Sequence, residues 1–206
     1  MNSVIVSLST TLITILVSMF AGYSLARGKF AGSGIVALLL LTTQMFPSAL
    51  LITPLLSQWS YLGLLNTYQV LILSYLTFTV PFTVWMLMGY FQTIPYEIEE
   101  SAMVDGCGRF DALIRIVLPL AAPGIAASAA YAFVSSWGEL LFAVSFINSK
   151  ARTTLPAGLL YMFGQTGVRW DILTAATMIS LIPVLVFFAF FQKYLISGLV
   201  TGAVKH

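Results

Sequence analysis

The sequence predicts an all-α, polytopic membrane protein with five transmembrane helices, and three features of composition and pattern indicate this fold class. Of the 206 residues, 59% are hydrophobic and only 8% are charged. Soluble domains usually carry charge on about a quarter of their residues to cover a water-facing surface. The mean hydropathy is +0.97. Finally, five apolar runs each approach or exceed the roughly 20 residues that a helix needs to cross a bilayer core.

The five runs are bounded by charged and turn residues. They cover residues 4–26, 34–57, 68–91, 122–147 and 172–195. The first run stops at Arg27-Gly28-Lys29, whose charges are costly inside hydrocarbon. Prolines within the runs predict kinks whose freed backbone groups are satisfied by neighbouring helices: Pro47, Pro54, Pro81 and Pro183.

Two of the runs carry small residues at every fourth position, a spacing that lets helix backbones approach closely. These residues are Ser18, Gly22 and Ala26 in the first run, and Gly124, Ser128 and Ala132 in the fourth. We therefore expect both helices to pack tightly against their neighbours.

The distribution of positive charge predicts the orientation, because cytoplasmic segments are enriched in Lys and Arg. Placing Arg27 and Lys29 inside puts six of the nine basic residues in the cytoplasm and three outside. The chain is then a multi-pass component of the cell (inner) membrane with a cytoplasmic C-terminus. The N-terminus falls outside, although no charged residue precedes the first run. We therefore expect that a preceding span is missing from this chain.

Residues 92–121 interrupt the hydrophobic pattern and carry five of the seven acidic residues. A connection of this length between spans is usually functional. Pro95 followed by three glutamates predicts the start of a short helix, because proline needs no N–H donor there and acids favour the positive end of the helix dipole. These glutamates are Glu97, Glu99 and Glu100.

A second short helix is predicted after the break at Asp105-Gly106. Its apolar stripe consists of Phe110, Leu113, Ile114 and Val117, and it ends at Leu118-Pro119. The two helices form an angled projection that presents alanine, glycine and phenylalanine where an exposed loop normally presents charge. This pattern indicates a docking surface for a partner protein.

Several function classes are excluded by composition. Cys107 and His206 are the only cysteine and histidine, so an internal disulfide, a thiolate metal cluster, haem ligation and most histidine-based catalysis lack their residues. No nucleophile–base pair is visible, so we do not expect an enzyme. A net charge of +2 argues against nucleic-acid binding. Transport, channel and scaffold roles remain.

Glu139 is the one acidic residue predicted inside a transmembrane run, and an intramembrane carboxylate is a candidate functional residue. It is expected to line a translocation path or a gate; the alternative is an internally hydrogen-bonded structural residue. Trp137 lies beside it, and Gln44 and Asn148 are further path candidates.

The loop residues resemble a known motif. Glu100-Ser101-Ala102, Asp105-Gly106, Phe110 and Leu118-Pro119-Leu120 resemble the coupling (EAA) loop of permease subunits in ATP-binding cassette (ABC) importers of type I. Further segments, such as Gln44-Met45-Phe46-Pro47 and Thr154-Leu155-Pro156, extend the resemblance to the carbohydrate branch, the maltose and glycerol-phosphate type, over nearly the whole chain. Two departures are Ser101, where the family usually has alanine, and Gly138, where asparagine is common.

The resemblance implies a single transmembrane permease domain over residues 1–206, in which the loop at 92–121 inserts into an ATPase subunit. Glu100, Ala102 and Gly106 would form the contact and the turn, while Asp105 and Phe110 fix the loop. The implied partners are a second homologous permease, two cytoplasmic ATPase subunits, an extracytoplasmic solute-binding protein and a sugar substrate. ATP and Mg would bind the ATPase, and this chain itself would hold no cofactor.

Two other functions remain open. An ATP-independent secondary transporter or channel usually needs several intramembrane ionisable groups, whereas this chain offers one. A scaffold subunit would use the loop only for docking and would tolerate the loss of the Glu139 carboxylate.

Overall fold

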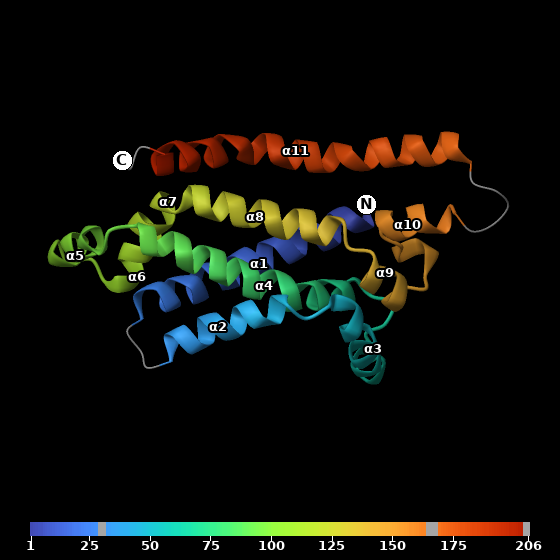
Figure 1. Cartoon of the computed structure of the whole chain (residues 1–206), viewed down its shortest axis with the longest axis horizontal. Helices are drawn as coiled ribbons and strands as arrows, with labels where there is room; N and C mark the ends of the chain where they lie inside the picture. The colour runs from blue at the N-terminus through green and yellow to red at the C-terminus, as the bar shows by residue number, and fades with distance from the viewer. Residues whose placement is uncertain (29–31, 164–168, 204–206) are drawn as a thin grey trace.

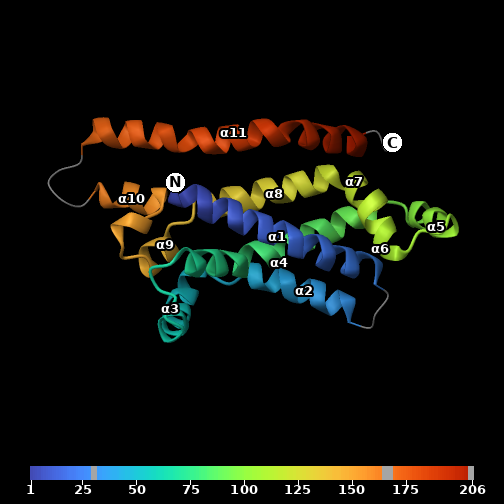
Figure 2. The ribbon, with the colours of Figure 1, turned by 180° about the vertical axis from the view of Figure 1, so that it is seen from behind.

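The computed structural model describes residues 1–28, 32–163 and 169–203, and within these ranges it contains helices and connecting segments but no strand. The long helices lie side by side along the longest axis of the molecule (Figure 1, Figure 2). They are α1 (Asn2–Arg27), α4 (Tyr68–Thr93), α8 (Ala122–Trp137) and α11 (Trp170–Ala203). In the described part, three helices are long and apolar enough to cross a membrane, or up to five if each bent pair counts as one span.

The first and third predicted spans are confirmed as α1 and α4, each 26 residues long. Their contact depends on Gly22, where a Cβ atom would lie 3.1 Å from the Cβ of Leu87. Gly124 of α8 lies even closer to α4, because a Cβ atom there would be 2.4 Å from the ring of Tyr90. The predicted close packing at these small residues is therefore confirmed.

The second predicted span is not one helix. It divides into α2 (Ser33–Gln44), the 3₁₀ turn η1 (Ser48–Leu51) and α3 (Ile52–Tyr61), with a bend of 92°. The expected kink at Pro47 is a complete break because proline has no N–H for the helix and its ring disfavours a helical conformation at Phe46. Pro54 is accommodated in the first turn of α3, where its missing N–H costs nothing.

The fourth predicted span is also interrupted. Helix α8 ends at Trp137, and the chain continues through Gly138, Glu139 and Leu140 into the short helix α9 (Leu141–Phe146). The sequence predicted Glu139 inside a transmembrane run. In the structure it lies instead in the break between α8 and α9. The fifth predicted span is confirmed as α11, which contacts α8 and α10 (Leu155–Tyr161) and leaves most of its described surface exposed.

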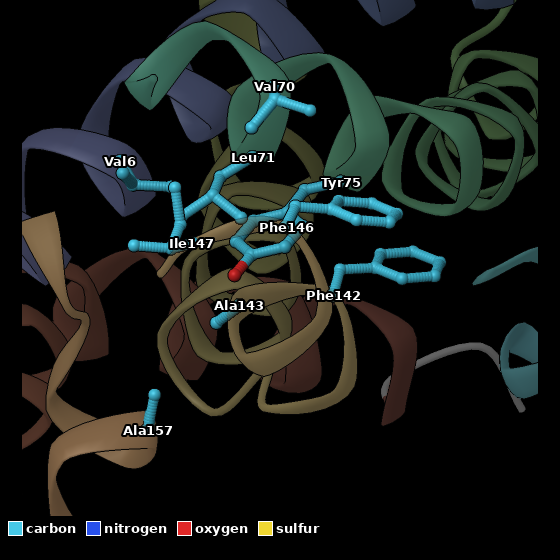
Figure 3. Packing of buried hydrophobic residues seen from close by; sticks show 9 residues of the cluster. All are labelled: Val6, Val70, Leu71, Tyr75, Phe142, Ala143, Phe146, Ile147 and Ala157. Atoms are coloured by element: carbon cyan, nitrogen blue, oxygen red, sulfur yellow. The ribbon is translucent and has the colours of Figure 1, made fainter. Parts of the chain in front are cut away.

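Two hydrophobic clusters hold the opposite ends of the bundle. One joins α9 and α10 to α1 and α4 around Tyr75, Phe142 and Phe146, whose side chains converge in Figure 3. The second lies under the 92–121 segment and is built on Leu87 and Phe91 of α4, with Val117 and neighbouring residues packed against them. Each cluster anchors a region that sequence analysis singled out: the α8–α9 break and the polar loop.

The start of α1 is tied to a segment far along the chain. The Asn2 side-chain amide donates hydrogen bonds of 2.9 Å to the carbonyl oxygens of Ala151 and Thr153. The side-chain oxygen Oδ1 of Asn2 accepts one from the Tyr68 hydroxyl at 2.9 Å, and Ser3 Oγ accepts one from the Leu155 N–H at 2.6 Å. Residues 2–3 and 151–155 therefore form one hydrogen-bonded junction at the end of the bundle opposite the loop.

Candidate functional site

Residues 92–121 fold into a compact helical unit at one end of the bundle (Figure 1). It comprises α5 (Tyr96–Val104), α6 (Arg109–Ala112), the π-helical turn η2 (Leu113–Val117) and α7 (Leu118–Leu120). The predicted first helix is confirmed, with Pro95 at its N-cap. The second begins as predicted but does not end at Leu118-Pro119: it continues to Leu120 and meets α8 at a bend of 75°.

The predicted apolar stripe of the second helix is only partly correct. Leu113 and Val117 are buried against α4, whereas Ile114 and Phe110 are exposed, Phe110 to 66%. The Phe110 ring stacks on Phe20 of α1, with 6.4 Å between ring centroids. Phe110 therefore lies beside the first transmembrane helix and leaves its other face exposed.

The predicted contact residues differ in exposure. Glu100, Ser101, Asp105 and Gly106 face solvent, Pro119 is exposed and Leu118 is half-buried. Gly106 has φ of +94°, and an added Cβ atom there would meet nothing within 4 Å, so backbone conformation and not lack of space favours glycine at this turn. Ala102 is only 6% exposed and packs inward, so its methyl group offers little surface to a partner.

Sequence reasoning missed two features of the loop. Val104 is 87% exposed beside the Gly106 turn, so it adds to the apolar surface of the projection. The buried residues Glu99 and Ala102 are three positions apart on one face of α5, and this spacing places Val104 on the other face. The second missed feature is an ion pair of 2.6 Å between Arg27 and the buried Glu99.

A second candidate site lies where the two helix breaks meet. A cavity of about 270 Å³ is lined by residues of both breaks and of α4: Thr43, Gln44, Phe46, Ser48, Phe78 and Glu139. Two of the predicted path residues, Gln44 and Glu139, are thus brought together from distant parts of the sequence. Discontinuous helices are a common way of building substrate sites within a membrane.

The other two predicted path residues lie elsewhere. Trp137 is buried and stacks on Phe133, with 5.7 Å between centroids. Asn148 is exposed beyond α9, where its backbone N–H donates to Asn66 Oδ1 at 2.5 Å. Neither residue lines the cavity.

The Glu139 carboxylate has a structural role as well as its place in the cavity. It accepts hydrogen bonds from the N–H groups of Phe142 at 2.9 Å and Ala143 at 3.2 Å, so it caps the start of α9. The Glu139 side chain is therefore internally hydrogen-bonded, as the alternative interpretation expected, and it also lines the cavity.

The family described as the binding-protein-dependent transport system inner membrane component matches residues 11–200. The chain belongs to this family. It is 37% identical to the sulfoquinovosyl glycerol transport system permease protein SmoH of Agrobacterium fabrum, with 99% of this chain and 72% of SmoH covered. It is 36% identical to the trehalose/maltose transport system permease protein MalG of Thermococcus litoralis, covering 99% of this chain and 74% of MalG.

The fold of this family member also matches a solved structure. A bacterial ABC transporter involved in the import of the acidic polysaccharide alginate superposes with a TM-score of 0.79 at 19% identity, covering 94% of this chain and 72% of that chain. The predicted all-α permease fold is therefore confirmed. The chain is an inner-membrane permease subunit that works with the other components of a binding-protein-dependent transport system.

Proposed function

We propose that this permease belongs to an ATP-driven importer for sugars or sugar derivatives. The observation that carries the proposal is the match over residues 11–200, together with relatives whose names refer to sulfoquinovosyl glycerol and to trehalose/maltose. In this proposal, the end of the bundle that carries the loop at 92–121 and the C-terminus faces the cytoplasm.

The loop at 92–121 is proposed to dock into the ATPase subunit. Val104 and Phe110 are exposed apolar side chains on a unit that projects from the bundle, and the exposed Glu100 offers a carboxylate beside them. Closure of an ATPase dimer would move this unit, and the movement would pass to the transmembrane helices as alternating access. ATP and Mg are assigned to the ATPase, and this chain holds neither.

The cavity between the helix breaks is proposed to be part of the sugar path. Its Phe46 and Phe78 rings can pack on the apolar face of a sugar, while Gln44 and Glu139 can bind hydroxyl groups. A mixture of aromatic surface and a few convergent polar groups suits a neutral, hydroxyl-rich substrate.

The other subunits of the transporter are proposed from the same family match. A second homologous permease, two ATPase subunits and an extracytoplasmic solute-binding protein would complete the transporter. The exposed apolar side chains of α11, such as Leu185 and Phe190, would face lipid or the second permease.

The deciding experiment is to purify the tagged chain from its native membrane in mild detergent and to identify co-purifying proteins by mass spectrometry. We expect an ATPase with a phosphate-binding loop and a second permease. Uptake of radiolabelled trehalose and maltose by cells that carry the complete transporter then tests the substrate class. Recovery of the chain alone, or uptake that persists without ATP hydrolysis, would favour a secondary transporter or channel.

A further inference from the structure

We infer that Arg27 and Glu99 form a joint that makes the first transmembrane helix and the loop helix α5 move as one body. The two residues are 72 positions apart in the sequence. They are positioning residues, and the inference rests on the proposed coupling function of the loop.

The Glu99 carboxylate is held by α1 at both of its oxygens. Arg27 Nε donates to Oε1 at 2.6 Å, and the Tyr23 hydroxyl donates to Oε2 at 2.8 Å. Tyr23 and Arg27 are one helical turn apart, so they present their donors from the same face of α1. The carboxylate is therefore fixed in direction as well as in distance.

The Arg27 guanidinium also holds the point where the chain leaves α4. Its Nη2 donates to the carbonyl oxygen of Ile94 at 2.8 Å. Ile94 is the extended residue between the end of α4 and Pro95, the N-cap of α5. The guanidinium also lies over the Tyr96 ring, 5.6 Å from its centroid. One side chain of α1 thus contacts both α5 and the connection that would act as its hinge.

The burial of Glu99 determines how the Arg27–Glu99 pair responds when α5 is displaced. Glu99 is 1% exposed, whereas the neighbouring Glu97 and Glu100 are exposed. Separating the pair would leave the buried Glu99 carboxylate without its compensating charge, so partly opened arrangements are disfavoured. A displacement of α5 is consequently transmitted to α1.

The other contacts of the loop with α1 are apolar: the Phe110 ring stacks on Phe20, and Met19 and Ala26 pack against the cluster that contains Leu113 and Val117. Helix α5 packs on α6 and η2, which belong to the loop itself, and η2 is joined to α4 by the Leu113 and Val117 cluster. The polar joint adds a direct connection from α5 to α1. Polar bonds of fixed geometry specify orientation, whereas apolar contacts can slide.

The test uses the complete transporter with its ATPase, second permease and binding protein. Arg27→Met removes the guanidinium donors and leaves the buried Glu99 carboxylate with the Tyr23 hydroxyl but without a compensating charge, which can impair folding. The double variant Arg27→Met/Glu99→Met avoids this problem, because an apolar pair often replaces a buried ion pair without loss of stability. Arg27→Lys retains the charge but lacks the planar fork that reaches both Glu99 and Ile94.

We expect the double variant to assemble with its ATPase and to show unchanged thermal stability. Its uptake should fall by about tenfold or more, and its ATP hydrolysis should no longer respond to the loaded binding protein. Spin labels at Leu8 and Glu97, in a Cys107→Ser background, should give one narrow distance in resting and nucleotide-trapped states of the wild type. The double variant should broaden that distribution.

A matched control is Arg115→Met, which breaks an exposed ion pair of 3.5 Å with Asp111 on the same loop. It should leave coupling unchanged, because exposed pairs contribute little. Wild-type uptake and a narrow distance in the double variant would overturn the inference, and so would an equal defect in Arg115→Met. Failure to recover any ATPase with the wild-type chain would instead defeat the proposed function.

Discussion

The side-chain amide of Gln44 donates a hydrogen bond of 3.1 Å to the backbone carbonyl of Phe78. Phe78 lies three residues before Pro81, whose missing N–H and bulky ring disturb the hydrogen bonding of α4 in this turn. The end of α2 is thereby fixed against the turn of α4 that contains Pro81. The bond also holds the α2–η1 break over the cavity that contains Glu139.

Replacing Gln44 with leucine should reduce sugar uptake without preventing assembly. The loss of one hydrogen bond costs about 1 kcal/mol, and the cavity also loses a polar group that can bind sugar hydroxyls. We expect about a tenfold higher KM for uptake. The exposed Gln58 of α3 is the control, and Gln58→Leu should transport normally. An unchanged KM in Gln44→Leu would remove Gln44 from the path.

The two roles of Glu139 can be separated by two substitutions. Glu139→Gln keeps an oxygen that can cap α9, whereas Glu139→Ala removes the cap at a cost of about 1 kcal/mol. We expect both variants to lose uptake if the carboxylate binds substrate, but only the alanine variant to lose thermal stability in detergent. Normal uptake by Glu139→Gln would assign the residue a capping role alone.

Gly106→Asp should leave membrane insertion intact and abolish uptake. A residue with a Cβ atom at φ of +94° is strained by about 1–2 kcal/mol, and the added charge alters the exposed tip of the loop. The measurement is membrane yield compared with uptake. Gly108 supplies the control, since its φ is −70° and an added Cβ atom meets only an ordinary contact of 3.7 Å with Asp111. Gly108→Ala is therefore expected to transport normally, and uptake by Gly106→Asp would contradict the assignment of the loop.

Gly124→Ala should destabilise the bundle. Its Cβ atom would lie 2.4 Å from the Tyr90 ring, and overpacking of this kind costs roughly 1–3 kcal/mol. A lower midpoint of thermal unfolding in detergent is the expected result, with partial recovery in Gly124→Ala/Tyr90→Ala. Gly89 on α4 has no atom within 4 Å of an added Cβ, so Gly89→Ala should be neutral or stabilising. An unfolding midpoint for Gly124→Ala equal to that of the wild type would refute the tight packing.

The sequence was sufficient to predict the helices whose signals are local. The uninterrupted runs of α1, α4 and α11 and the Pro95 start of α5 follow from hydropathy and capping chemistry. At Pro47 the sequence predicted only a kink where the structure has a complete break, and the break at Gly138 was not predicted, because an apolar segment has the same hydropathy whether it is straight or bent.

The features of the candidate sites that the sequence did not predict depend on contacts between residues far apart in the chain. Gln44 and Glu139 were both proposed from the sequence, but only the folded chain brings them to one cavity. The Arg27–Glu99 pair could not be found by periodicity, because Glu99 stands among exposed glutamates that look equivalent in the sequence. Long-range pairing of this kind is decided by tertiary packing.

The junction between Asn2, Ser3 and residues 151–155 also constrains biosynthesis. Its hydrogen bonds join positions 149 to 152 residues apart, so they cannot all form until residue 155 has left the ribosome. The first helix enters the membrane early, and the hydrogen bonds of Asn2 and Ser3 to residues 151–155 are not formed while the later helices are inserted. Truncated chains that stop before residue 150 should therefore hold α1 loosely and be favoured substrates for membrane proteases.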